Sequence, residues 1–227
     1  YDYTKCILED VKEIKQTMHG LSLCWSYHPH HYEVQCNSMQ TVSDAFNHDD
    51  TLKKVIAKRI KMGDNMSDNG LRKMLKIFTG VQCVSNFRPT AAAAIYTKFT
   101  PKNGSVYDMS CGYGGRMMGA HIAGMKYYGV EPCAATFQGL NKMKNDFNID
   151  ANIRQEGSEI GGWLPDNSVD MCFTSPPYFD CEKYSKEETQ SYIKYPTKEL
   201  WLKGFMRDTL NDCYRVTKPG GVIALNI

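Results

Sequence analysis

The sequence predicts an α/β protein in which a mostly parallel sheet carries helices on both faces, preceded by a helical region. Two observations predict this arrangement. After about residue 86, apolar runs with strand character alternate with segments of helical spacing, which is the pattern of a parallel sheet with crossover helices. Before about residue 85, apolar residues recur at helical spacing and strong strand signals are missing. We therefore expect two domains, a helical accessory region over residues 1–85 and an α/β domain over residues 86–227.

The elements of the second domain are expected in the following order. Proline is favoured at the first position of a helix, so "RPTAAAAIYTKF" opens one. The strand "GSVYDMS", the helix "GGRMMGAHIAG" and the strand "KYYGVEP" follow. Next come the helix "AATFQGLNKMKNDF" and the strands "ANIRQEGS" and "SVDMCFTS". The long helix "KELWLKGFMRDTLNDCYRVT" then leads through the turn "KPGG" into the strand "VIALNI".

Two helices with basic faces are expected in the first domain, in "DDTLKKVIAKRIKMG" and "SDNGLRKMLKIF". Their apolar positions are Leu52, Val55, Ile56, Ile60, Leu71, Met74, Leu75 and Phe78, and their basic positions are Lys53, Lys54, Lys58, Arg59, Lys61, Arg72, Lys73 and Lys76. Such faces are usually solvated helix surface. Two of them close in sequence also suit a phosphate backbone, so this region is a candidate nucleic-acid-binding region.

The composition favours a chain without membrane or secretory segments. Lysine and arginine number 27 against 25 aspartate and glutamate residues, so any basic surface must be local. There is no run of 18 apolar residues and no basic-then-apolar leader. The nine cysteines form no CxxC pair, which favours reduced thiols and a cytoplasmic location, in the host cytoplasm if phage-encoded or in the nucleus if eukaryotic. Since the chain starts at Tyr1 and stops inside a predicted strand, we expect a piece of a longer protein. The sequence does not predict the oligomeric state.

One cluster of potential metal ligands lies early in the chain. The stretch "CWSYHPHHYEVQC" places Cys24, His28, His30, His31 and Cys36 within 13 residues. Its CxxxH and HxxxxC spacings fit no common structural zinc site. We therefore favour an ordinary turn over a metal site, and no metal is expected.

The strongest local signal is the break of a buried strand in "DMCFTSPPYFD". Two prolines remove two backbone donors, so the strand must stop at Thr174 or Ser175. The residues that follow therefore lie at the carboxyl end of the strand, which is where ligands bind in open α/β sheets. Taken alone, the motif is also compatible with an ordinary strand exit.

A second signal is the glycine-rich turn in "DMSCGYGGR", which ends the first strand. Gly112, Gly114 and Gly115 let backbone amides approach a ligand closely, and Asp108 can accept a hydrogen bond from it. Met117 stands where a dinucleotide motif has its last glycine, so the turn suits a different nucleotide-like cofactor. At the end of the next strand, Glu131 can accept from both hydroxyls of a ribose.

Together, "DMSCGYGG", "GVEP" and "TSPPY" resemble the motifs of the amino-methyltransferase family that modifies exocyclic amines in DNA, nearest to phage-type and bacterial DNA methylases. The resemblance covers residues 86–227, includes "NFRPTAAAAIYTKF" before the first strand, and has the cofactor motif before the catalytic loop. It implies a Rossmann-like methyltransferase fold and S-adenosylmethionine as the cofactor. It also implies double-stranded DNA as the partner, with the target base flipped out of the helix.

The resemblance implies roles for individual residues as well. In the [DNS]PP[YFW] loop, the Ser175 side chain and the Pro176 carbonyl would orient the amine, Pro177 would stiffen the loop, and Tyr178 would stack on the extruded base. The implied cofactor-binding residues are Phe87, Arg88, Asp108, Ser110, Gly112, Gly114, Glu131, Pro132, Glu156 and Ser158. Because direct transfer needs no covalent intermediate, Cys172 is expected to be core packing.

Several alternatives stay open. Serine before Pro-Pro leans toward cytosine N4, with adenine N6 a close alternative. An RNA guanine-N2 methylase or a protein glutamine methylase has a similar loop, more typically begun by Asp or Asn. A non-catalytic nucleic-acid-binding partner of the same fold is the alternative from another class. Arg88 is expected to meet a cofactor carboxylate or to lie on the surface, and Arg116 to pair with a carboxylate or extend to solvent. The loop "FDCEKYSKEETQSYIKYP" is either a mobile lid or an exposed linker.

Overall fold

The computed structural model describes residues 17–227, which divide into two compact units. The described residues of the first, the sheet unit, are 17–28, 86–179 and 187–227. The second, the helical unit, comprises residues 29–85 and 180–186. This division differs from the predicted boundary at residue 85. Residues 17–28 group with the sheet, and residues 180–186 group with the helical unit, where Glu182 and Lys183 pair with Cys36 and Gln35.

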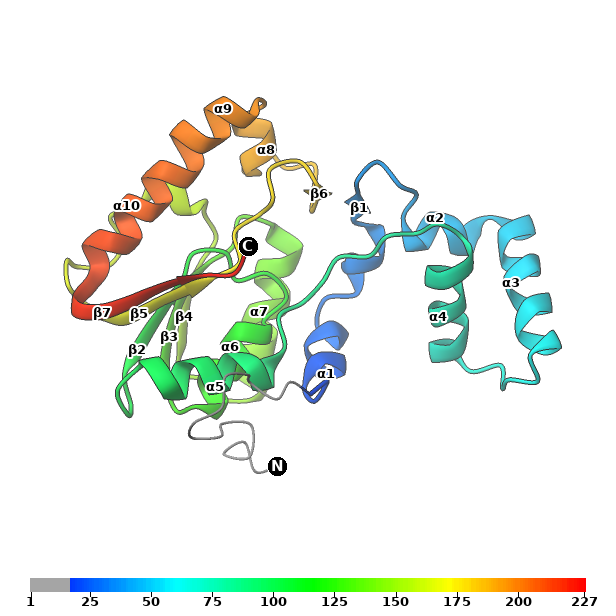
Figure 1. The fold of residues 1–227 in the computed structure, drawn as a ribbon, viewed down its shortest axis with the longest axis horizontal. Helices are drawn as coiled ribbons and strands as arrows, with labels where there is room; N and C mark the ends of the chain where they lie inside the picture. The colour runs from blue at the N-terminus through cyan, green and yellow to red at the C-terminus, as the bar shows by residue number, and fades with distance from the viewer. Residues whose placement is uncertain (1–16) are drawn as a thin grey trace. The chain divides into compact units, whose positions relative to one another are not determined.

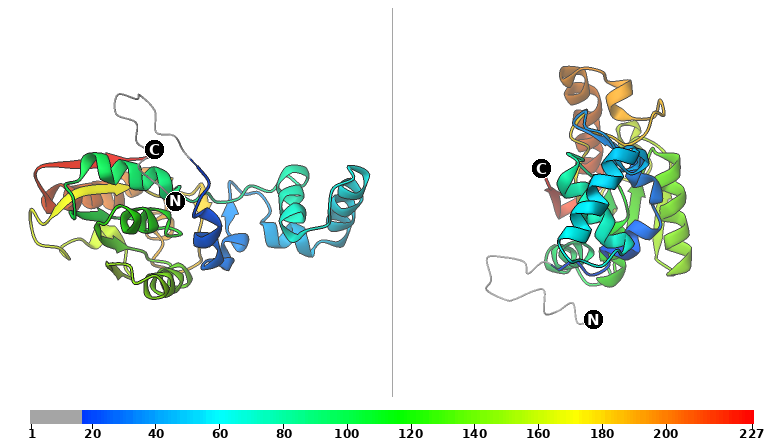
Figure 2. Two further views of the ribbon diagram at one scale, coloured as in Figure 1. Left: turned by 90° about the horizontal axis from the view of Figure 1, so that it is seen from below. Right: turned by 90° about the vertical axis from the view of Figure 1, so that its right-hand side faces the viewer.

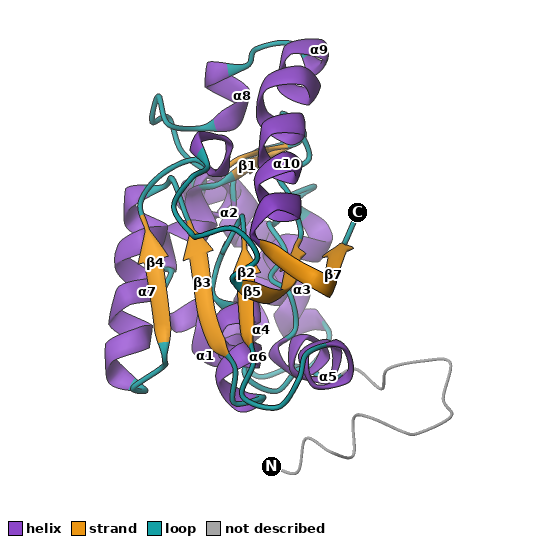
Figure 3. Cartoon of the chain, turned by 90° about the vertical axis from the view of Figure 1, so that its left-hand side faces the viewer, coloured by secondary structure: helices purple, strands orange, loops and turns teal. Residues whose placement is uncertain are grey.

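The sheet unit is built on a five-stranded sheet in the order β4-β3-β2-β5-β7. These strands are β2 (Ser105–Asp108), β3 (Lys126–Val130), β4 (Ala151–Arg154), β5 (Val169–Thr174) and β7 (Thr217–Leu225). Every pairing among them is parallel, and in Figure 3 the arrowheads of β4, β3 and β2 point in one direction. The order matches the first five strands of doubly wound Rossmann-like folds, so the predicted fold class is confirmed.

Helices pack on both faces of this sheet, as the sequence predicted. One face carries α1 (Leu21–Ser26), α5 (Pro89–Phe99), α6 (Gly115–Ile122) and α7 (Ala134–Asp146), whose buried side chains share one core with Tyr127 and Phe173. The opposite face carries α10 (Arg207–Val216), where Cys213 and Val216 pack with Val169 and Cys172. Figure 1 shows α10 and α5 on opposite sides of the strands.

The predicted helix over residues 198–217 is present but not uniform. It consists of α9 (Lys198–Leu200), a π-helical turn η4 (Trp201–Met206) and α10, and it follows the short α8 (Ser191–Lys194). A 3-10 turn, η3 (Ser158–Ile160), follows β4. The residues of the predicted turn "KPGG" lie within the bounds of β7. They have no partner in β5, because the register passes from Val169 with Thr217 to Met171 with Val222, and regular pairing begins at Val222.

The helical unit contains the 3-10 helix η2 (Pro29–Glu33), α2 (Val42–Asn47), α3 (Asp49–Lys61) and α4 (Asp68–Phe78). Its two short strands, β1 (Gln35–Cys36) and β6 (Glu182–Lys183), pair antiparallel. Helices α3 and α4 lie side by side (Figure 1 and Figure 2). The small core of the helical unit is formed by Val42, Ala45, Val55, Met74, Leu75 and Val81. None of the helices described for the chain is long and apolar enough to cross a membrane.

The predicted faces of α3 need two corrections. Ile60 was expected in the apolar stripe but is 64% exposed. Arg59 was expected on the basic face but is buried, because its guanidinium donates to the Asn65 carbonyl and pairs with Asp64 at 3.4 Å. Lys53, Lys54 and Lys58 are exposed, as predicted. The helix therefore presents lysines to solvent, while its arginine holds the turn that follows it.

Candidate active site

The predicted site motifs lie at one edge of the sheet. The turns after β2, β3 and β5 all leave the carboxyl ends of neighbouring parallel strands. Chain connections run from β2 outward to β3 on one side and return to β5 on the other, so β2 and β5 border the switch point where such folds bind ligands. The glycine-rich turn, Glu131 and the Ser-Pro-Pro-Tyr loop are thus brought to the same edge.

The glycine-rich turn uses its glycines for different reasons. Gly112 and Gly114 have positive φ values of 54° and 78°, a region that disfavours side chains. A Cβ on Gly115 would lie 1.8 Å from the Phe87 carbonyl oxygen, so only glycine allows this close approach. A Cβ on Gly112, in contrast, would meet no neighbouring atom nearer than 3.9 Å. The turn is therefore packed at its end and open at Gly112.

Asn86 fastens the segment before α5 to this turn. Its Oδ1 accepts from the Gly115 amide at 3.2 Å, and its Nδ2 donates to the Tyr113 carbonyl at 3.1 Å. The sequence-based site did not include Asn86. A polar residue next to Phe87 was the available signal, but its partners lie 27 and 29 positions away in the chain.

Asp108 is fully buried at the end of β2 and anchors the glycine-rich turn by hydrogen bonds. Its oxygens accept from Arg116 Nε at 2.7 Å and Nη2 at 3.2 Å, from the Tyr127 hydroxyl at 2.7 Å and from the Ser110 amide at 3.2 Å. The carboxylate raises the pKa of the buried Arg116 guanidinium above its usual value, against the opposing effect of burial. Of the two alternatives for Arg116, pairing with a carboxylate is therefore confirmed. Direct contact of Asp108 with a ligand stays a prediction, since protein groups already make four hydrogen bonds to it.

Glu131 joins the turns after β2 and β3. Its Oε2 accepts from the Gly112 amide at 3.1 Å and its Oε1 from the Cys133 amide at 2.9 Å. Burial raises the pKa of the carboxyl group to about 8, although both amides favour the charged form. Among residues 17–227 no cation is found paired with it. The site thus holds a buried carboxyl group beside the open glycine turn.

The Ser-Pro-Pro-Tyr loop follows directly after β5, which ends at Thr174 as predicted. Its start and end are held by Asn226, which the sequence-based site also missed. Asn226 Nδ2 donates to Ser175 Oγ at 2.9 Å and its amide donates to the Thr174 carbonyl at 2.9 Å. The Tyr178 hydroxyl donates to the Asn226 carbonyl at 3.3 Å, while Tyr178 as a whole is 41% exposed. In the described part of the chain, the buried Thr174 hydroxyl has no hydrogen-bond partner.

The segment before α5 packs against this edge. The Phe87 ring meets the Phe173 ring edge-on at 5.2 Å between centroids, and the Arg116 guanidinium lies 5.9 Å from the centroid of the Phe87 ring. Arg88 is the N-cap of α5 and is half-buried. The structure thus places Phe87 beside β5, the strand that leads into the Ser-Pro-Pro-Tyr loop, and Arg88 at the start of α5. A cofactor contact by either residue stays a prediction.

The remaining predicted cofactor residues have protein contacts. The Ser110 carbonyl accepts from Arg116, and the Pro132 carbonyl accepts from the Thr189 hydroxyl at 3.2 Å. After β4, Glu156 pairs with Arg154 at 3.5 Å, and Ser158 is buried with its hydroxyl 2.9 Å from that of Thr209. Ser158 therefore belongs to the packing of η3 on α10. The structure does not test whether these residues also touch a cofactor.

Part of the predicted lid lies over the turn after β3. The Glu187 carboxylate accepts from the Ala134 amide at 3.1 and 3.2 Å, at the amino-terminal end of α7, where negative charge is favoured. The preceding residues, Glu182–Lys183, form strand β6 within the helical unit. The loop is thus held by contacts at both of these places.

Two further sequence-based questions concern cysteine and histidine. Cys172 is buried inside β5, as expected for core packing. In residues 17–227 no group of three or more histidine, cysteine or acidic side chains is arranged to hold a metal ion. His28 instead places its Nδ1 2.9 Å from the Cys24 carbonyl.

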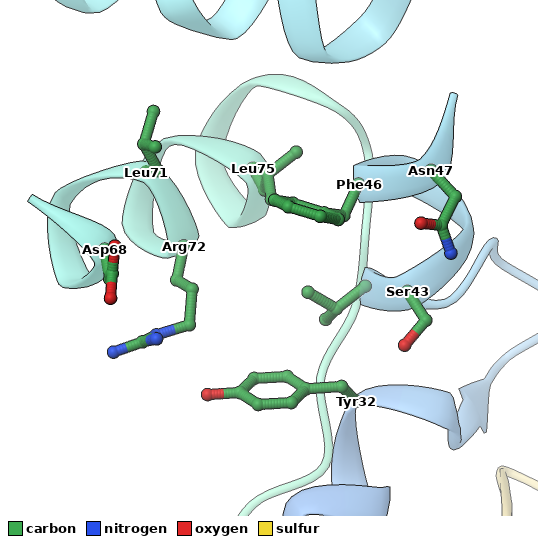
Figure 4. A pocket seen from close by; sticks show the side chains of 9 residues that line it. Tyr32, Ser43, Phe46, Asn47, Asp68, Leu71, Arg72 and Leu75 are labelled. Atoms are coloured by element: carbon green, nitrogen blue, oxygen red, sulfur yellow. The ribbon is translucent and has the colours of Figure 1, made fainter. Parts of the chain in front are cut away.

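The helical unit contains a pocket of its own, shown in Figure 4, with a volume of about 530 Å³. Both apolar and polar side chains line it. The lining residues are Tyr32, Val42, Ser43, Phe46, Asn47, Asp68, Leu71, Arg72 and Leu75. Arg72 is the one basic side chain in this lining, so the exposed lysines of α3 and α4 lie outside the pocket.

No protein-family model matches the sequence, and no curated protein matches it either. Solved structures with a similar fold include a putative S-adenosyl-L-methionine-dependent methyltransferase from Methanococcus maripaludis, with 17% identity, 61% of this chain and 55% of that chain covered, and a TM-score of 0.43. Another is an S-adenosylmethionine-dependent O-methyltransferase from Thermotoga maritima, with 15% identity, coverages of 63% and 45%, and a TM-score of 0.44.

A third similar structure is a putative rRNA methylase from Clostridium thermocellum, with 14% identity, coverages of 62% and 72%, and a TM-score of 0.42. The chain spans about half the length of the first two proteins. At these identities and scores all three are distant structural neighbours, and none of them assigns an activity to this chain.

Proposed function

We propose that the chain is an S-adenosylmethionine-dependent methyltransferase that acts on the exocyclic amine of a base in DNA. One observation carries the proposal. The loop Ser175 to Tyr178 leaves β5 at the same sheet edge, and beside the same switch point, as the glycine-rich turn and Glu131. A methyl donor held at β2 and β3 and an amine held after β5 are then adjacent.

The residues present suit this cofactor. Burying a carboxyl group without a cation is costly, and a ligand that brings hydroxyl donors and positive charge would reduce that cost at Glu131. S-adenosylmethionine has both features, because it contains a ribose and supplies a methyl group on a sulfonium. The open space at Gly112, next to the Glu131 carboxyl, supports binding of the ribose at this point.

In this reaction the protein has to align the amine nitrogen with the methyl group of the cofactor. The lone pair of an exocyclic amine is delocalised into the base, so the nitrogen is a poor nucleophile. Hydrogen bonds from its two N–H groups to Ser175 Oγ and the Pro176 carbonyl would favour a tetrahedral nitrogen that faces the methyl group. A nitrogen–carbon bond then forms as the carbon–sulfur bond breaks, and the amine loses one proton to solvent. No protein nucleophile is needed.

The proposed base is cytosine, modified at N4, because the loop begins with serine. Adenine N6 is the alternative within the same chemistry. The ring of Tyr178 supports either choice, since it is partly exposed and its hydroxyl is held on the Asn226 carbonyl. A base taken out of the duplex can stack on such a ring.

DNA as the partner is supported by exposed lysines on α3. Replacing Lys53, Lys54 and Lys58 together with serine should weaken binding to unrelated duplexes and flatten the dependence of affinity on salt. The control is the same change at Lys98, Lys102 and Lys126, which are exposed near the opposite, amino-terminal edge of the sheet. Equal salt slopes for both triple variants would show that the α3 lysines do not bind the phosphate backbone.

The experiment that tests the proposed activity is single-turnover transfer from methyl-labelled cofactor to DNA. Ser175→Ala should lower the transfer rate more than DNA affinity, because the hydroxyl aligns a nitrogen and does not hold the backbone. Tyr178→Ala should lose about 1–3 kcal/mol of stacking while cofactor affinity stays near wild type. Ser168→Ala, just before the start of the same strand, is the matched control. If the Ser175 and Tyr178 variants both transfer at the wild-type rate, the loop is an ordinary strand exit.

A further inference from the structure

We infer that Asn226 is a positioning residue, whose side-chain amide fixes the Ser175 hydroxyl so that the hydroxyl can take a substrate amine. The inference rests on the proposed function, because it assigns a role within the same site. Asn226 follows β7, in the part of the sequence where no functional motif was recognised.

Three contacts of Asn226 converge on one loop. The backbone of Asn226 donates to the Thr174 carbonyl and accepts from the Tyr178 hydroxyl, so this residue touches the residues on both sides of Pro176 and Pro177. These two bonds need only backbone atoms. The third bond, from Asn226 Nδ2 to Ser175 Oγ at 2.9 Å, depends on the side chain. The side chain therefore has a task that the strand itself does not perform.

The chemical consequence follows from the capacity of a hydroxyl group. A serine hydroxyl has one O–H donor and two acceptor lone pairs, and its proton rotates to suit its surroundings. An amide N–H from Asn226 occupies one lone pair. The other lone pair is left to accept an N–H of the substrate, and the O–H is left to donate.

This arrangement has a consequence for substrate class. An amino group next to an unprotonated ring nitrogen offers a donor and an acceptor side by side, which matches the remaining lone pair and O–H of Ser175. Cytosine N4 with N3, and adenine N6 with N1, both have this pattern. The Asn226 amide thus supports an aminated base as the substrate, in preference to a group that offers acceptors alone.

The test compares three variants by single-turnover transfer and by cofactor titration. Asn226→Ala removes the donor, and Asn226→Gln keeps a donor on a longer side chain. Asn226→Asp replaces the donor with an acceptor, so that the Ser175 O–H would turn to donate to the new carboxylate. Asn152→Ala is the matched control, because Asn152 is an exposed asparagine on the other edge strand, β4. We expect Asn226→Ala and Asn226→Asp to lower the transfer rate by roughly 10- to 100-fold, as small misplacements do.

Partial rescue is expected for Asn226→Gln, and cofactor affinity should be unchanged in all variants. In a Ser175→Ala background, Asn226→Ala should cause little further loss, because the two side chains act as one unit. A wild-type rate for Asn226→Ala, or an equal loss in both backgrounds, would overturn the inference.

A second measurement separates this inference from the proposed function. Amide hydrogen exchange at Tyr178 needs no substrate, and it should be several-fold faster in Asn226→Ala than in Asn152→Ala if the side chain orders the loop. If the wild-type protein transfers no methyl group to DNA, the proposed function fails, and faster exchange still supports the positioning role. Unchanged exchange at Tyr178 overturns the positioning role whatever the activity.

Discussion

The buried carboxyl group of Glu131 should make stability depend on pH in an unusual direction. Its pKa is about 8 in the folded protein, against an ordinary value of 4.5, chiefly because of burial. Between these two values the folded state binds a proton that the unfolded state has lost. The free energy of unfolding should therefore fall as the pH rises through this window, whereas carboxylates with lowered pKa values have the opposite effect at acid pH.

The size of the effect follows from the same two values. A window from 4.5 to about 8 corresponds to a total on the order of 5 kcal/mol, with a limiting slope of about 1.4 kcal/mol per pH unit. Glu131→Gln keeps the size of the side chain but does not titrate. It also leaves one of the two backbone amides, of Gly112 or Cys133, without a good acceptor, which costs about 1–3 kcal/mol at every pH.

The assay is urea unfolding of the wild-type and Glu131→Gln proteins between pH 5 and 8.5. The free energy of unfolding of the wild type relative to Glu131→Gln should fall steadily as the pH rises and should level off above about pH 8. Because a fall on the order of 5 kcal/mol exceeds the offset of about 1–3 kcal/mol, the wild type should be the more stable protein near pH 5 and the less stable one above about pH 8. Cofactor affinity should move the other way for the wild type, since hydroxyl donors favour the charged carboxylate. A difference between the two proteins that is constant over this pH range would refute the reasoning.

Two further changes test the packing beneath the site. Arg116→Met leaves the buried Asp108 carboxylate without its cation and should cost about 3–5 kcal/mol in urea unfolding. The double change Asp108→Leu with Arg116→Met should cost less than Arg116→Met alone, because no unpaired charge is left buried. A double variant less stable than the single one would contradict the assigned ion pair. Gly115→Ala places a Cβ 1.8 Å from the Phe87 carbonyl oxygen and should destabilise the protein by about 1–3 kcal/mol. It should also weaken cofactor binding in titration calorimetry. Unchanged affinity would mean that the segment before α5 is not part of the site.

The sheet and its motifs could be predicted from the sequence because their signals are local. Alternating strands and helices predicted the parallel sheet, and the two prolines after Ser175 predicted where β5 ends. The end of each strand then placed Gly112 and Glu131 at one edge, since carboxyl ends of parallel strands meet there. Patterns that act within a few residues were sufficient for this part.

What escaped prediction depends on partners far apart in the chain. Asn86 and Asn226 hold the site through side-chain amides, and nothing in a single sequence shows which backbone groups such amides will meet. Tyr127, one strand away from Asp108, completes the buried network for the same reason. Helical spacing placed Arg59 on a solvent face, but the turn after α3 offered it acceptors that outweighed the pattern.

The most direct test of the proposed function is to find where the methyl group goes. The protein is incubated with duplex DNA and cofactor carrying a deuterated methyl group, and the DNA is then digested to nucleosides for mass spectrometry. We expect a deuterated methyl group on the exocyclic nitrogen of cytosine or adenine, and its loss in Ser175→Ala. A label on carbon 5 of cytosine, or an unlabelled DNA in the presence of bound cofactor, would contradict it.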